Sequence, residues 1–163
     1  MNRRSLFRSA AAAGALALVA GCSAGVTGGG DIVDVASSND DFSTLVAAVS
    51  AADLAETLQG DGPFTVFAPT NEAFAALPAG TVDSLLLPEN KAQLVEVLTY
   101  HVAPGYYPAS ALAGAQGGVP TVQGGTLRVD GTNGVKVGNA NVITPDVAAS
   151  NGVIHAIDRV LLP

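Results

Sequence analysis

Cysteine, tryptophan and charged residues are all scarce in this chain. Its 163 residues include one cysteine and no tryptophan, and 13% of them are charged. A single cysteine excludes a disulfide framework, a zinc finger and other thiolate clusters, because each needs several ligands at fixed spacing. The G-x-x-x-x-G-K, G-x-G-x-x-G and H-E-x-x-H signatures are also absent, and the G-x-S-x-G pattern occurs only at residues 21–25, where no strand is predicted before it to form a nucleophile elbow. We therefore expect no cofactor, no metal and no catalytic residues.

Positive charge is scarcer than negative charge. Seven basic residues face fourteen acidic ones, which gives a net charge of -7. Three of the basic residues lie in the first eight positions, so the chain from Cys22 onward carries four cations against all fourteen carboxylates. Such a surface repels phosphate backbones, and we expect no nucleic-acid partner.

The first 21 residues have the layout of an export signal. A positively charged start precedes a short alanine-rich run and small residues at a cleavage point. The run is short for a membrane span, which needs about 20 apolar residues, although a retained helix is the alternative. Arg3 and Arg4, followed by Ser5-Leu6-Phe7, resemble a twin-arginine signal, and the choice between that route and Sec stays open.

The sole cysteine, Cys22, follows this signal directly. Val19-Ala20-Gly21-Cys22 resembles the bacterial lipobox, in which the cysteine becomes the lipid-bearing first residue. We predict lipidation at Cys22, with a chance free thiol as the alternative. Residues 22–30 are rich in glycine and small residues and are predicted to form a flexible tether. The mature protein is then expected to be anchored to the cell membrane or outer membrane, facing the periplasm or cell surface.

Residues 31–163 are predicted to form one α+β domain, because helical patterns come first and strand patterns follow. With 48% hydrophobic residues, the chain can build one core. The expected helices begin at Asp40 or Asp41, near Leu54, after a cap at Thr70, and at Pro88. The expected strands are residues 64–68, a hairpin of 127–129 with 135–137, residues 142–144, and residues 153–162, the last in the middle of its sheet.

The two histidines are the main ionisable candidates. His101 continues the apolar stripe of the preceding helix, and His155 lies in phase with Val153 and Ile157 on a buried strand. For both, a buried and hydrogen-bonded structural role is favoured over a functional one. A Ser-His-Asp arrangement with Asp158 is formally possible, but no particular serine is implicated. Tyr100 is either an exposed interface anchor or a packed ring.

Three segments resemble signatures of one family, the fasciclin (FAS1) domain. Residues 64–74 (FTVFAPTNEAF) resemble its first signature, residues 98–102 (LTYHV) its Tyr-His motif, and residues 151–161 (NGVIHAIDRVL) its closing signature. They occur in the family's order and span the mature chain. The resemblance implies an α+β fold in which a curled β-sheet wedge packs with several α-helices.

The same resemblance implies adhesion. In animal members the Tyr-His pair and its aliphatic flanks have been linked to integrin binding. Carried over, this marks Tyr100 and His101, flanked by Leu98 and Val102, as the expected partner-binding residues. This chain holds one copy of the domain, where many animal members hold several, so it lacks built-in avidity.

Three functional hypotheses follow. The leading one is a membrane-tethered adhesion module in the bacterial cell envelope that binds a cell-surface or matrix protein or glycan, including biofilm components, without covalent chemistry. The second is a small-ligand-binding or enzymatic envelope lipoprotein whose pocket is lined by Tyr100, His101 and His155. The third is structural support of the envelope without specific recognition.

Overall fold

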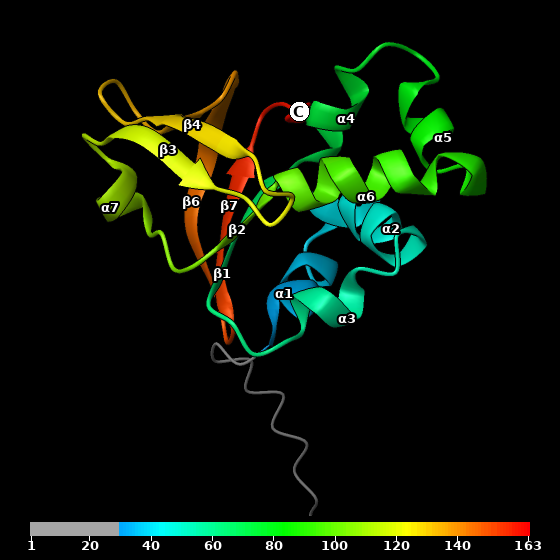
Figure 1. Cartoon of the computed structure of the whole chain (residues 1–163), viewed down its shortest axis with the longest axis horizontal. Coiled ribbons are helices and arrows are strands. Elements are labelled where there is room, and N and C mark those ends of the chain that lie inside the picture. The colour runs from blue at the N-terminus through cyan, green and yellow to red at the C-terminus, as the bar shows by residue number, and fades with distance from the viewer. Residues whose placement is uncertain (1–29) are drawn as a thin grey trace, which may run out of the picture.

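A computed structural model describes residues 30–163 of the chain. The predicted export signal, the lipid site at Cys22 and residues 23–29 of the predicted tether lie outside the described residues. The fold is α+β, as predicted, and Figure 1 shows helices gathered on one side of a curled sheet and a strand hairpin arching over the other. None of the helices in residues 30–163 has the length and apolar character needed to cross a bilayer.

Helices dominate the chain up to His101, which we call the helical segment (residues 31–101). They are α1 (Ile32–Ser37), α2 (Ser43–Ala51), α3 (Ala55–Leu58), α4 (Asn71–Ala75), α5 (Thr81–Leu85) and α6 (Lys91–Tyr100), with 3-10 turns at Asp40–Phe42 and Pro88–Asn90. The hydroxyl of Thr70 caps α4 by accepting a hydrogen bond from the Ala73 N–H at 3.3 Å, which confirms the predicted cap.

The predicted cap at Asp40 or Asp41 was wrong. Asn39 caps the 3-10 turn that leads into α2, because its side chain accepts a hydrogen bond from the Asp41 N–H at 3.1 Å. The six-residue helix α1 was not predicted. Its N-cap is Asp31, whose carboxylate accepts a hydrogen bond from the Asp34 N–H.

Strands dominate the rest of the chain, the strand segment (residues 102–163). One strand, β1 (Phe64–Pro69), comes from the helical segment. The others are β2 (Val102–Pro104), β3 (Gln116–Pro120), β4 (Thr126–Asp130), β5 (Lys136–Val137), β6 (Ala140–Ala149) and β7 (Gly152–Ile157), and the short helix α7 (Ala109–Leu112) precedes β3. The sheet order is β2-β1-β7-β6-β5-β4-β3, with β1 and β7 parallel and the other pairs antiparallel.

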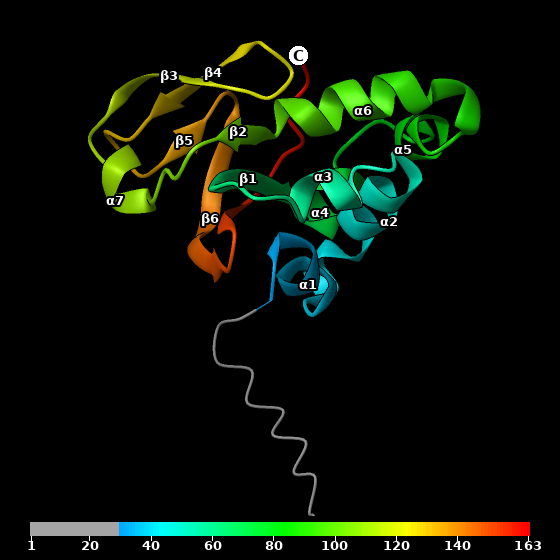
Figure 2. The same ribbon diagram turned by 60° about the horizontal axis from the view of Figure 1, so that its bottom comes forward.

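Two hydrophobic cores lie on opposite faces of the central pair β1 and β7. Val66, Ala68, Ile154 and Ala156 face the helices and belong to the first core. Phe67 and Ile157 face the other way and pack with residues of the strand segment in the second core. This alternation follows from the period-two geometry of strands. Figure 2 shows β1 between the helices and the β3–β5 layer.

The closing strand is central, as predicted, but shorter than predicted. β7 ends at Ile157, and residues 158–162 leave the sheet. The Asp158 carboxylate turns back to accept hydrogen bonds from the main-chain N–H and side-chain Nδ2 of Asn141, both at 2.8 Å. The apolar side chains that suggested a longer strand, Val160 and Leu161, are buried by packing into the two cores instead.

Asn151 joins the start of the domain to the start of β7. Its side-chain oxygen accepts a hydrogen bond from the Ile32 N–H at 3.0 Å, and its Nδ2 donates to the carbonyl of Leu58. The neighbouring Ser150 N–H donates to the Gly30 carbonyl at 2.9 Å. The described chain therefore enters the domain at the turn between β6 and β7.

Candidate functional site

The Tyr-His motif lies where α6 gives way to β2. Tyr100 is the last residue of α6, His101 is its C-cap, and β2 begins at Val102. The side chains of Leu98, His101 and Val102 are buried, with 5%, 2% and 6% of their surface exposed. The structure thus brings the four predicted partner-binding residues together, but places three of them in the interior.

Both ring nitrogens of His101 are bonded to the backbone. Nδ1 lies 2.7 Å from the carbonyl oxygen of Val97, and Nε2 accepts a hydrogen bond from the Leu161 N–H at 2.9 Å. A carbonyl can only accept, so Nδ1 carries the proton and the ring is neutral. Burial lowers the pKa of His101 to about 4, against the opposing effect of the Val97 carbonyl. The ring joins the end of α6 to the C-terminal segment.

Tyr100 is the member of the motif that reaches the surface. Its ring is half-buried and packs on the edge of the second core, away from the helical side. It lies beside the β3–β4 turn, since a Cβ built on Gly125 would be 3.3 Å from the Tyr100 Cε2. The tyrosine therefore supports this turn and remains partly exposed to solvent.

His155, in the strand segment, also has both ring nitrogens bonded to the backbone. Its Nε2 lies 2.8 Å from the Tyr107 carbonyl, and its Nδ1 accepts a hydrogen bond from the Asp146 N–H at 3.2 Å. The ring stacks on Phe67, with centroids 5.6 Å apart. Burial lowers the pKa of His155, against the opposing effects of the Tyr107 carbonyl and the Asp146 charge.

The structure supports the prediction that both histidines are buried and hydrogen-bonded and help to hold the fold. The rings share no hydrogen-bond partner, and the apolar gap of about 10 Å³ that His101 lines is lined by neither Tyr100 nor His155. Asp158 is held by Asn141, not by a histidine, so the formal Ser-His-Asp arrangement is not assembled. Within residues 30–163, no group of three or more His, Cys, Asp or Glu side chains is placed to hold a metal.

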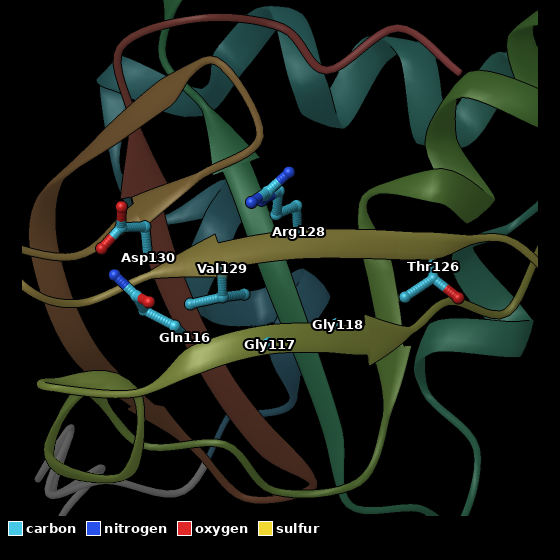
Figure 3. Close-up of a pocket in the computed structure, with 7 residues that line it drawn as sticks. All are labelled: Gln116, Gly117, Gly118, Thr126, Arg128, Val129 and Asp130. Atoms are coloured by element: carbon cyan, nitrogen blue, oxygen red, sulfur yellow. The ribbon is translucent and has the colours of Figure 1, made fainter.

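A polar groove on β3 and β4 was missed from the sequence. It has a volume of about 550 Å³ and is lined by Gln116, Gly117, Gly118, Thr126, Arg128, Val129 and Asp130. Figure 3 shows Asp130 and Gln116 at one end, Thr126 at the other, and Arg128 between them. On the groove face of β3, Gly118 has no side chain opposite Arg128, and the Thr126 methyl group occupies the space where a Cβ on Gly118 would lie.

The groove depends on strand register, which sequence spacing alone did not supply. Gly118 pairs with Arg128, and Gln116 pairs with Asp130 across the β3–β4 ladder. The exposed residues of β4 alternate with buried Leu127 and Val129. That alternation was visible in the sequence, but β3 was not predicted, because Gly117 and Gly118 disfavour strands.

Comparisons with known proteins agree with the fold. A family profile described as the Fasciclin domain matches residues 40–163. Over 133 residues the chain is 62% identical to protein sll1483 of Synechocystis sp., covering 81% of this chain and 73% of that protein. Over 134 residues it is 41% identical to the immunogenic protein MPB70 of Mycobacterium bovis, covering 78% of this chain and 66% of that protein.

Two further similarities reach animal proteins. The chain is 42% identical over 135 residues to the transforming growth factor-beta-induced protein ig-h3 of Sus scrofa, covering 82% of this chain but only 19% of that protein. A solved FAS1 domain pair from the insect cell adhesion molecule Fasciclin I superposes with a TM-score of 0.71 at 21% identity, covering 82% of this chain and 51% of that one. The second similarity supports the fold.

Proposed function

The chain belongs to the fasciclin domain family, and we propose that it acts as a non-enzymatic adhesion module that binds protein or glycan partners in a bacterial cell envelope. The observation that carries this proposal is the commitment of both histidines. Each ring uses both nitrogens on backbone groups in the interior. A histidine held in this way is not free to act as a general acid or base.

We favour binding by an exposed surface over binding in a pocket. The residues proposed for the second hypothesis, Tyr100, His101 and His155, do not line a common cavity among those described. Tyr100 is the member of the Tyr-His motif with its ring edge at the surface, and we assign it the partner contact. Leu98, His101 and Val102 hold the end of α6 beneath it. Tyr100→Ala is expected to weaken binding while Tyr100→Phe, which keeps the ring, preserves more of it.

Membrane attachment completes the proposal. A lipid on Cys22 would anchor the protein, and the short segment up to Gly30 would hold the domain close to its membrane. Stable anchoring needs more than one acyl chain or a second signal. The module would then act where it is displayed, and many copies on one surface would add avidity to a weak single site. The location, exported and membrane-bound, is part of the same proposal.

Attachment of intact cells tests the adhesion proposal. Cells lacking the protein, cells with the wild-type chain and cells with Cys22→Ala are compared for attachment to a polysaccharide-coated or matrix-coated surface. Ser23→Ala serves as the matched control, because it changes the adjacent residue and leaves the cysteine. We expect attachment to fall in the deletion and in Cys22→Ala only. Equal attachment in all four strains, together with no partner recovered by crosslinking on intact cells, would refute the proposal.

A further inference from the structure

Charge is divided unevenly between the two segments of the domain. The helical segment holds eleven of the fourteen carboxylates and a single cation, Lys91, which pairs with Asp53. The strand segment holds three carboxylates and three cations, Arg128, Lys136 and Arg159. An anionic partner is therefore repelled by the helical side and meets less repulsion on the strand side.

Arg128 lies between two glycines, one on each side of β4. It pairs with Gly118 on β3, and on its other side the Gly138 N–H donates to the Arg128 carbonyl at 2.6 Å. No side chain stands on either neighbouring strand at this level. Within the described residues Arg128 forms no ion pair, and its side chain is exposed. The guanidinium is free to donate two parallel hydrogen bonds to a carboxylate.

The rest of the groove surface offers neutral donors and one fixed acceptor. The hydroxyl and N–H of Thr132 bond to the Asp130 carboxylate at 2.6 and 3.0 Å, and these bonds hold the pKa of Asp130 below its ordinary value. Asp130 therefore stays ionised. Across the sheet it lies in one row with Gln116, Lys136 and Asn141.

We propose that this groove binds an acidic polysaccharide, with a sugar carboxylate on the Arg128 guanidinium and sugar hydroxyls on Asp130, Gln116 and Thr126. This rests on the proposed non-covalent adhesion function and names the chemistry of its partner. Arg128 and Asp130 lie about 7 Å apart along β4, two residues at roughly 3.3 Å each. A uronic-acid chain carries one carboxylate per ring with hydroxyls between, which matches a cation next to an acceptor.

An acidic peptide matches the groove less well. The ionised Asp130 accepts hydrogen bonds, and a sugar ring supplies hydroxyl donors between its carboxylates, whereas a run of acidic side chains supplies no side-chain donor. The groove also offers few apolar contacts for peptide side chains, because its floor is glycine backbone and the buried Val129. A polymer of sugar rings needs neither an apolar pocket nor a second cation at the Asp130 position.

Binding of purified full-length protein to polygalacturonate tests the assignment. Methyl-esterified polygalacturonate is the uncharged control polymer and polyglutamate the peptide control. We expect polygalacturonate to bind with an affinity that falls as salt rises, and both controls to bind at least ten-fold more weakly. Equal binding of polyglutamate would show that the partner is an acidic peptide or that attraction is non-specific, and would overturn the proposal.

Three variants locate the site. Arg128→Gln is expected to reduce affinity for polygalacturonate at least ten-fold, whereas Lys91→Gln, which removes the same charge from the helical segment, changes it less than two-fold. Lys136→Gln should fall between them. An unchanged melting temperature shows that each variant is folded. If Arg128→Gln binds normally, the groove assignment is wrong.

The same variant separates this inference from the adhesion proposal. If cells carrying Arg128→Gln attach like wild type while the Cys22→Ala strain does not, the adhesion proposal is supported and the assignment of binding to the groove is refuted. If attachment is lost in both strains and polygalacturonate binding is lost only in Arg128→Gln, the adhesion proposal and the groove assignment are both supported.

Discussion

The helical and strand segments each cover one face of the central strand pair, but they differ in secondary structure and in charge. The helical segment covers one face of β1 and β7 with short helices, and all but one of its charged residues are acidic. The strand segment covers the other face with a hairpin layer, and its charges are balanced. The difference indicates a division of work. Negative charge favours solubility on one side, and the mixed-charge side is the one to which we assign contact with a partner.

Each segment also has one buried histidine that binds backbone from distant parts of the chain. His101 joins α6 to the C-terminal segment, and His155 joins β7 to the chain around Tyr107 and Asp146. The two rings carry the proton on different nitrogens, Nδ1 in His101 and Nε2 in His155, because a carbonyl accepts from a different atom in each. The segments thus share one device for holding irregular backbone.

The largest expected effect comes from the residue at the centre of the second core. Phe67 is fully buried and stacks on His155. Phe67→Ala should lower the free energy of unfolding by about 3 to 5 kcal/mol, because it removes a large buried ring and leaves a cavity. Urea denaturation followed by circular dichroism measures the change.

A matched substitution on the opposite face sharpens the comparison of the two cores. Ile154→Ala removes a fully buried side chain that faces the helices, and should cost about 2 to 5 kcal/mol. Because both residues sit on the central strand pair, each variant should show one cooperative transition. Two separate transitions in either variant would mean that the segments fold independently.

Acid should destabilise the domain through the histidines. The folded state holds His101 neutral with its pKa near 4, while the unfolded chain binds the proton below about pH 6.5. Stability from this residue is therefore complete above pH 6.5 and is lost as the pH falls to 4, by roughly 3 kcal/mol at about 1.4 kcal/mol per pKa unit. Denaturation midpoints between pH 7 and 4 measure this loss.

His101→Gln provides the control for the acid effect. Glutamine can donate and accept hydrogen bonds but does not titrate in this range. Its profile should be flatter between pH 6.5 and 4, with a remaining slope from His155, whose pKa burial also lowers. A profile as steep as that of the wild type would show that other groups cause the acid sensitivity.

Removing the His101 ring should have a moderate effect at neutral pH. His101→Ala leaves the Leu161 N–H and the Val97 carbonyl without their partner, at a cost of about 1 to 3 kcal/mol. Thermal unfolding at pH 7.5 measures it, with His155→Ala as the counterpart in the strand segment. An unchanged melting temperature for His101→Ala would contradict the structural role given to this ring.

The smallest effect is expected at the surface ion pair of the helical segment. Lys91 and Asp53 pair with both side chains well exposed, so Lys91→Ala should change stability by less than about 1 kcal/mol. The change should shrink further in high salt. A larger loss that persists in salt would mean that the lysine stem contributes packing.

Much of the fold could be predicted because local signals agreed with tertiary packing. The strand at residues 64–68, the cap at Thr70 and the hairpin of β4 with β5 all follow from residue types within a few positions. The burial of His101 and His155 followed from their phase with apolar neighbours. The partner-binding role predicted for residues 98–102 stays a prediction, and the burial of Leu98 and Val102 beside His101 depends on packing that local patterns do not specify.

The features that were missed depend on contacts between distant residues. β6 was predicted only at residues 142–144, but it continues through Pro145 and Asp146 to Ala149 because register shifts accommodate them. Asp146 has a positive φ of 56°, which no local pattern indicated. The groove on β3 and β4 likewise needs Gly118 to face Arg128, a pairing set by the register.

The junction at Asn151 determines how the domain would carry mechanical load. A pull on the chain at Gly30 reaches the turn before β7 directly, through Ser150 and the Asn151 side chain. β1 and β7 both start at that end and run parallel from Phe64 and Gly152 to Pro69 and Ile157. If force acts on this end of β7 and on the opposite end of β1, the hydrogen bonds between the two strands are loaded in shear and must break together instead of one at a time.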